Sequence, residues 1–150
     1  MKQYIGTKII QAEPAYRVDG KVFVKANIVP CGVHIEDGYK VVYPDGYESW
    51  SPKDVFEAAY RETSGMSFGL AIEAAKMGKK IARAGWNGKN QYVELGHDFS
   101  YTAPGDIPVR PVQHLDIGSQ ALVFVGTRGR QVGWLASQSD MLADDWKIVE

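Results

Sequence analysis

The chain has 150 residues, 45% of them hydrophobic and 23% charged, and a formal net charge of −1 at pH 7, all normal for a folded protein. The charge argues against a long nucleic acid as partner, because such affinity needs many Lys and Arg contacts to phosphates. A single cysteine, Cys31, excludes an intramolecular disulfide, and no apolar run approaches the roughly 18 residues of a membrane span, so we expect a soluble cytoplasmic protein that contacts no membrane.

Residues 1–62 predict strands followed by one helix. Segments 4–12 and 21–28 are rich in β-branched and aromatic residues and end in turn formers. Residues 38–50 predict a β-hairpin that turns at Pro44-Asp45-Gly46, where Pro fixes φ and Gly accepts a positive φ. These elements indicate a small N-terminal α+β domain.

The helix of this domain is predicted to start at Ser51-Pro52, with Ser51 as the cap and Asp54 completing a capping box. Four apolar residues recur at helical spacing and are expected to form its buried stripe: Val55, Phe56, Ala59 and Tyr60. We favour core packing over a functional role for these aromatic residues.

The polar segment 62–67 predicts a boundary, with one domain over 1–62 and a second over 66–150. In the second domain Ser67 is expected to cap a helix that buries residues 68, 71, 72 and 75, and Gly78 to end it in the left-handed region. Strands are predicted at 79–84, 91–95, 121–126, 131–135 and 146–149, with a turn at 127–130 and a long surface loop over 96–113. The fold class is therefore α+β, with small antiparallel sheets in two subdomains.

The segment from Ser137 to Asp140 has a capping-box pattern and predicts a short helix. We expect Met141, Leu142 and Trp146, which follow it, to lie in the core. Each half of the chain alone would bury little of its surface, so packing between the halves or self-association is expected.

Catalytic and metal-binding patterns are weak. His97-Asp98 and His114-x-Asp116 are His–acid neighbours, but no nucleophile turn accompanies them, and a solvated pair is the better interpretation. Cys31 and His34 show no ligand spacing with other His residues, and phosphate-binding glycine motifs are absent from the sequence. We predict no catalytic residue, no metal and no cofactor.

Two tryptophan-bearing segments predict a binding site instead. Trp86 lies in a glycine-flanked turn, Gly85-Trp86-Asn87-Gly88, where a ring can stack on a base and Asn87 can bond its edge. The alternatives are a core tryptophan and an ordinary turn asparagine. The second segment begins at Trp134 and supplies the polar candidates Ser137, Gln138 and Asp140, although Asp140 could simply cap the helix.

Cations near these segments are candidate partners for one or two phosphates. Arginine binds phosphate bidentately, and lysine binds it as a point charge. The candidates are Arg83 and Lys89, with Arg128 and Arg130 at the predicted turn. The alternative for each is a solvated surface charge.

The segment from Met66 to Gly88 resembles the opening of a small phage and prophage family whose best-understood members are Thoeris anti-defence proteins of the second type. The family's closing motif, Trp-Leu-Ala-Ser-Gln-x-Asp-Met-Leu-Ala-x-Asp-Trp, is matched from Trp134 to Trp146. Gly133 departs from the proline that is frequent in the family, and residues 92–122 match poorly. The first 62 residues look like a domain of phage proteins of unknown role.

The resemblance implies a homo-oligomer, a dimer or tetramer, that binds and sequesters a cyclic nucleotide immune signal without cleaving it. That signal would be glycocyclic ADP-ribose, made by TIR-domain defence proteins, or a cyclic dinucleotide. Trp86, Asn87, Trp134, Ser137, Gln138 and Asp140 match the two motifs. Two alternatives stay open: a nucleotide hydrolase that uses the 97–116 loop, and a phage structural or host-interaction protein.

Overall fold

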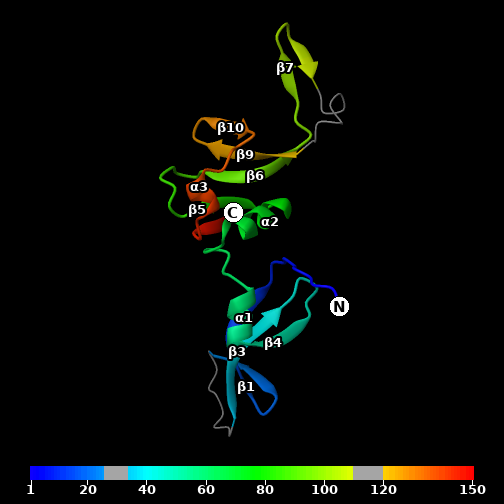
Figure 1. Ribbon diagram of the computed structural model, residues 1–150, viewed down its shortest axis with the longest axis vertical. Coiled ribbons are helices and arrows are strands. Elements are labelled where there is room, and N and C mark those ends of the chain that lie inside the picture. The colour runs from blue at the N-terminus through cyan, green and yellow to red at the C-terminus, as the bar shows by residue number, and fades with distance from the viewer. Residues whose placement is uncertain (26–33, 110–119) are drawn as a thin grey trace. The chain divides into compact units, whose positions relative to one another are not determined.

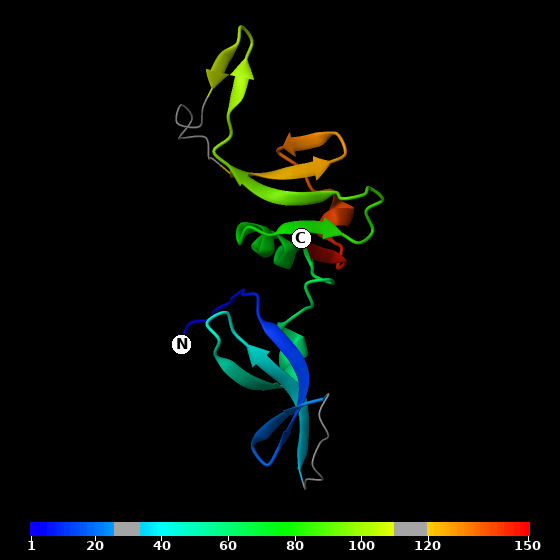
Figure 2. The same cartoon turned by 180° about the vertical axis from the view of Figure 1, so that it is seen from behind.

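The computed structural model describes residues 1–25, 34–109 and 120–150. The chain divides into two compact units, Met1–Arg61 and Glu62–Glu150, which Figures 1 and 2 show from opposite sides. Both units combine antiparallel strands with short helices, and this confirms the predicted α+β class. In the described part of the chain, no helix has the length and apolar character needed to cross a membrane.

The first unit is a four-stranded antiparallel sheet in the order β2-β1-β3-β4. Its strands are β1 (Gln11–Val18), β2 (Lys21–Val24), β3 (Ile35–Val42) and β4 (Glu48–Pro52). The predicted hairpin is confirmed as β3–β4, and Gly46 in its turn has a φ of 84°. The strand predicted at 4–12 is wrong, because β1 pairs along its whole length with β3, and Ala15 and Val18 of β1 are buried. Residues 4–10 have no strand partner in the part of the chain that the structure describes.

Helix α1 (Lys53–Ala59) follows β4 directly. Its N-cap is Pro52, without a side-chain cap, because the Ser51 hydroxyl donates to the Pro52 carbonyl oxygen. The predicted buried stripe is wrong for Val55, whose exposed fraction is 56%, and α1 has no fully buried residue. Phe56 instead stacks between two half-buried tyrosines, Tyr39 at 4.2 Å and Tyr60 at 4.9 Å between ring centroids.

The second unit contains a five-stranded antiparallel sheet in the order β10-β9-β6-β5-β11. Its strands are β5 (Lys80–Arg83), β6 (Tyr92–His97), β9 (Gln120–Gly126), β10 (Gly129–Val132) and β11 (Trp146–Val149). The helices are α2 (Phe68–Lys76), which contacts β5, β6 and β11, and α3 (Gln138–Met141). Ser67 caps α2 and Gly78 follows it with a φ of 83°, both as predicted.

Two expectations for this unit need correction. The predicted loop 96–113 contains a hairpin, β7 (Tyr101–Ala103) with β8 (Ile107–Val109), because Gly105 and Asp106 adopt the positive φ that a tight turn needs. The strand predicted at 131–135 ends at Val132, since Gly133 has a φ of 84° and takes the chain out of the extended region.

The core of the second unit lies between α2 and the sheet. Its fully buried side chains come from both layers: Met66, Ala71, Ala74, Ala75, Ile81, Val93 and Trp146. Met66 also exchanges two backbone hydrogen bonds with Trp146, N to O at 2.7 Å and 3.1 Å. The start of the unit is therefore joined to β11, the last strand, which forms one edge of the sheet.

Candidate functional site

The two tryptophan segments meet beside the end of β5. Trp86, in the turn after β5, lies edge-on to Trp146 at 5.4 Å and to Trp134 at 6.0 Å between ring centroids. It also meets Phe124 of β9 edge-on at 5.7 Å. Edge-to-face contacts between aromatic rings are favourable beyond the area they bury. The sequence leaves open whether the two segments line one pocket within a subunit or meet across an interface. Within this chain their indole rings contact each other, with Trp86 and Trp134 half-buried.

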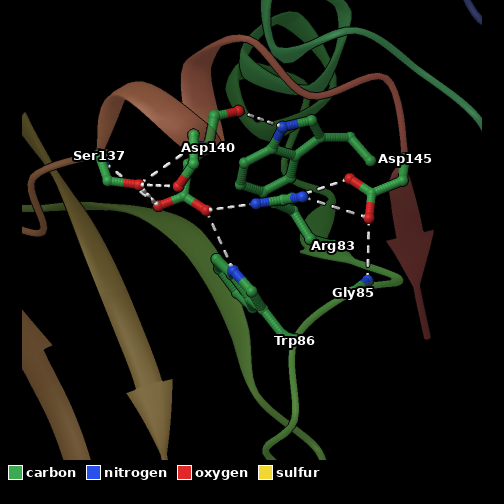
Figure 3. A network of polar contacts seen from close by, with 8 residues as sticks. Arg83, Gly85, Trp86, Ser137, Asp140 and Asp145 are labelled. Atoms are coloured by element: carbon green, nitrogen blue, oxygen red, sulfur yellow. Dashed lines mark hydrogen bonds and ion pairs between the residues drawn. The ribbon is translucent and has the colours of Figure 1, made fainter.

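Arg83, the last residue of β5, lies between two carboxylates (Figure 3). Its Nε donates to Asp145 Oδ1 at 2.8 Å, and its Nη1 donates to Asp140 Oδ1 at 3.0 Å. Only 20% of the Arg83 side chain is exposed. The guanidinium predicted to bind phosphate is therefore already offset by two negative charges within the chain.

Asp140 accepts hydrogen bonds from both segments. Its Oδ1 accepts from Trp86 Nε1 at 3.2 Å as well as from Arg83. Its Oδ2 accepts from the backbone N of Ser137 at 3.2 Å and from the Ser137 hydroxyl at 2.7 Å, which completes a capping box at the start of α3. Both oxygens are engaged, as Figure 3 shows, so Ser137 and Asp140 fix the local structure.

Asp145 is a functional candidate that the sequence reasoning missed. Its Oδ2 accepts from the backbone N of Gly85 at 2.9 Å, and its backbone oxygen accepts from the N of Ala84 at 3.0 Å. A Cβ on Gly85 would lie 3.0 Å from the same carboxylate oxygen, a tight contact that would require the Asp145 side chain to shift. The signal was present in the sequence, because Asp145 is the last acidic residue of the closing motif.

We call these six residues the Arg83 network: Arg83, Gly85, Trp86, Ser137, Asp140 and Asp145. The hydrogen bond from Arg83 lowers the pKa of the Asp145 carboxyl below its ordinary value, against the opposing effect of burial. Burial acts to raise the pKa of the Asp140 carboxyl, but hydrogen bonds from Ser137, Arg83 and Trp86 together lower it. Hydrogen bonds to Asp145 and then Asp140 raise the pKa of Arg83. The network therefore stabilises both carboxyls in the charged form.

Five other predicted site residues are exposed to solvent. Asn87 and Lys89 are exposed in the turn that carries Trp86, and Gln138 is exposed at the first position of α3. Arg128 is exposed in the β9–β10 turn, and Arg130 pairs with Glu94 at 3.2 Å. The polar groups open to a ligand are thus beside the tryptophan rings, while the charged groups beneath them are paired.

Those candidate catalytic residues that the structure describes do not gather into a site. His97 Nδ1 lies 3.6 Å from Asp98 Oδ2, with 64% and 72% of the two side chains exposed. His114, Asp116 and Cys31 lie outside the described residues. His34 is exposed and pairs with Glu36 at 3.3 Å. Across residues 1–25, 34–109 and 120–150, no three His, Cys, Asp or Glu side chains form a group suited to a metal ion.

Part of the predicted core is exposed. Trp146 is fully buried, as expected, but Met141 and Leu142 are 39% and 78% exposed. The prediction for these two residues is wrong, because the short α3 turns its polar cap toward the Arg83 network and leaves them at its outer end. Leu135, in the same motif, is 89% exposed. Three large apolar side chains of the closing motif are thus exposed in the single chain.

Comparison with known proteins gives two matches to the second unit. The family model of the Thoeris anti-defense 2-like domain matches residues 66–149. The protein "Thoeris anti-defense 2" of Bacillus phage SP01 is 37% identical over 91 residues, which cover 56% of this chain and 94% of that relative. The matched region contains both tryptophan segments and the whole Arg83 network. The chain therefore belongs to the Thoeris anti-defense 2-like family.

Proposed function

We propose that this chain is a phage anti-defence protein that binds and sequesters a cyclic nucleotide immune signal in the cytoplasm of an infected bacterium, without cleaving it. The signal would be glycocyclic ADP-ribose or a cyclic dinucleotide. The observation that carries the proposal is that both family motifs meet at one place, where half-buried tryptophan rings adjoin exposed polar side chains. The relative's name, an anti-defence protein against Thoeris, supports the biological role.

The chemistry of the site suits binding better than catalysis. A purine ring can stack on an exposed indole face for roughly 1–3 kcal/mol, and an amide such as Asn87 or Gln138 can bond its edge. Lys89, exposed in the same turn, can supply a charge to a phosphate. No general base is needed for such binding, and the carboxylates of the Arg83 network are held charged by their partners.

We also propose that the site is completed in a homo-oligomer, a dimer or tetramer. Leu135 and Leu142 are large apolar side chains with 89% and 78% of their surface exposed in one chain. Large exposed apolar patches often mark a protein interface, and these two side chains would contribute to one. A second copy placed against them would lie next to Gln138 and close the ligand between subunits.

The proposal is tested by titrating the purified chain with glycocyclic ADP-ribose and with cyclic dinucleotides. The protein is then denatured and the released nucleotide identified by mass. We expect stoichiometric binding and recovery of the intact compound. No binding to any of these nucleotides would refute sequestration, and recovery of a hydrolysed product would favour the nucleotide hydrolase.

A matched pair of lysine variants locates the site. Lys89→Ala should weaken binding, while Lys79→Ala, an exposed lysine before the opposite end of β5, should not. Native mass spectrometry of the loaded protein gives the number of subunits and ligands. A monomer that binds ligand fully would exclude the proposed subunit interface.

A further inference from the structure

The turn that carries Trp86 and Asn87 is held mainly by hydrogen bonds to residues outside the turn. Trp86 N donates to Arg83 O at the long distance of 3.4 Å, a weak closing bond for a turn. The stronger bonds come from the segment before β11, about sixty residues away in sequence. Asp145 accepts from the backbone N of Ala84 at 3.0 Å and from that of Gly85 at 2.9 Å.

Asp145 is also linked, through Arg83, to Asp140, the acceptor for the Trp86 indole N–H. Its Oδ1 accepts from Arg83 Nε at 2.8 Å, and the other end of the same guanidinium donates to Asp140 Oδ1 at 3.0 Å. That oxygen is the acceptor for Trp86 Nε1 at 3.2 Å. Asp145 therefore contacts the backbone of the turn directly and is linked to the Trp86 side chain through Arg83 and Asp140.

We propose that Asp145 is a positioning residue for ligand binding: it holds the Gly85-Trp86 turn so that the indole face and the Asn87 amide have fixed places. This inference takes its ligand from the proposed function. The claim that Asp145 holds the turn in place does not depend on that function. Asp145 acts through Arg83, Gly85 and Trp86 and does not itself touch the ligand. Fixing a binding loop beforehand reduces the ordering cost of association.

The test compares Asp145→Asn with Asp144→Asn in the full chain. Both changes remove one negative charge from neighbouring positions, but Asp144 is exposed and makes no side-chain hydrogen bond among the described contacts. Asparagine keeps the size of Asp145 and can accept one bond, but it lacks the second anionic oxygen that Arg83 requires. We expect affinity for glycocyclic ADP-ribose to fall at least about tenfold in Asp145→Asn only.

A readout without ligand separates positioning from binding. In a ¹H–¹⁵N spectrum, Asp145→Asn should shift the indole N–H resonance of Trp86 and speed hydrogen exchange at the Gly85 amide. The amides of Ile81 and Val93, fully buried in the sheet, serve as the control for an intact fold. An unchanged Trp86 resonance and Gly85 exchange rate, or unchanged affinity, would overturn the proposal.

Different results would contradict the proposed sequestration and the proposed positioning role of Asp145. If the wild-type chain binds none of the nucleotides, the proposed function falls, and the spectra still decide whether Asp145 fixes the turn. If the wild-type chain binds and Asp145→Asn binds equally well, sequestration stands and Asp145 has no positioning role. If exchange speeds up at Ile81 and Val93 as well, Asp145 supports the whole unit, which also contradicts a role confined to the turn.

Discussion

Trp86 and Trp146 donate their indole N–H groups to the same residue, Asp140. Trp86 Nε1 donates to the carboxylate at 3.2 Å, and Trp146 Nε1 donates to the backbone oxygen at 2.9 Å. The two rings also meet edge-on at 5.4 Å. A half-buried ring at the candidate site is thus coupled to the buried ring at the centre of the core, through both packing and a shared acceptor. Changes to Trp86 should therefore affect stability as well as binding.

Replacing Trp86 by phenylalanine tests this coupling. Trp86→Phe keeps an aromatic ring but removes one hydrogen bond to a charged acceptor, which should lower the free energy of unfolding of the second unit by about 2 kcal/mol. Trp50→Phe in the first unit is the control, because Trp50 Nε1 is buried without a partner among the described residues, so no hydrogen bond is lost. Chemical denaturation measures both changes. An unchanged free energy of unfolding in Trp86→Phe would contradict the assignment of the Trp86 bond.

Acid should destabilise the second unit through the carboxylates of the Arg83 network. Asp140 and Asp145 both have pKa values lowered from 3.8 in the folded chain, so they favour folding when charged. That contribution is fully present above the unfolded pKa and is lost as the pH falls through the lowered folded values. The free energy of unfolding should thus drop below about pH 4.

The pH dependence has its own control. Asp145→Asn should flatten the acid loss, and Asp144→Asn should leave it as in the wild type, because the Asp144 side chain is exposed and makes no hydrogen bond among the described contacts. Denaturation curves taken from pH 7 downward supply the comparison. An acid loss of the same size in Asp145→Asn would mean that other groups cause it.

The sequence predicted those elements whose determinants are local. The cap at Ser67, the left-handed Gly78, the hairpin turn at Gly46 and the capping box at Ser137 each depend on a few adjacent residues, and each is present in the structure. The strand predicted at 4–12 failed because a strand is decided by its partner, which is β3 for residues 11–18. Local composition does not specify which distant strand a segment pairs with.

In the candidate site too, local features could be predicted from the sequence and long-range contacts could not. The motifs identify both tryptophan segments as candidates for the site but not their mutual placement, and the structure brings Trp86 and Trp134 to 6.0 Å between ring centroids. The pairing of Arg83 with Asp145 spans 62 residues, and no spacing rule connects positions so far apart. For this reason the sequence predicts Arg83 as a phosphate ligand and gives no indication of its pairing with Asp145.

In the first unit, Gly38 should tolerate no side chain. A Cβ built there would lie 2.8 Å from Trp50 Cζ2 and 2.9 Å from Cε2, and it would also collide with the Ser51 carbonyl oxygen. Gly38→Ala should therefore destabilise the first unit by about 1–3 kcal/mol, since backbone and a packed indole must move. Gly6→Ala, where a Cβ meets nothing within 4 Å, should have little effect. Thermal denaturation of both variants checks the difference, and equal melting temperatures would show that Trp50 does not pack on Gly38.

Gly133 provides a test of the backbone that leads into Trp134. Its φ of 84° is far from the value near −65° that a proline ring imposes, and its N–H donates to the Leu122 oxygen at 2.9 Å. Gly133→Pro loses the hydrogen bond and the conformation together, so it should destabilise the second unit by on the order of 3 kcal/mol. Gly133→Ala keeps the N–H and meets nothing within 4 Å, so only the left-handed strain of roughly 1–2 kcal/mol should remain. Because Trp134 N donates to the same Leu122 oxygen at 2.9 Å, the proline variant should also disturb the Trp134 indole resonance, whereas the alanine variant should not. If Gly133→Pro proves as stable as Gly133→Ala, the chain adopts a negative φ at this position and Trp134 approaches the site by a different path.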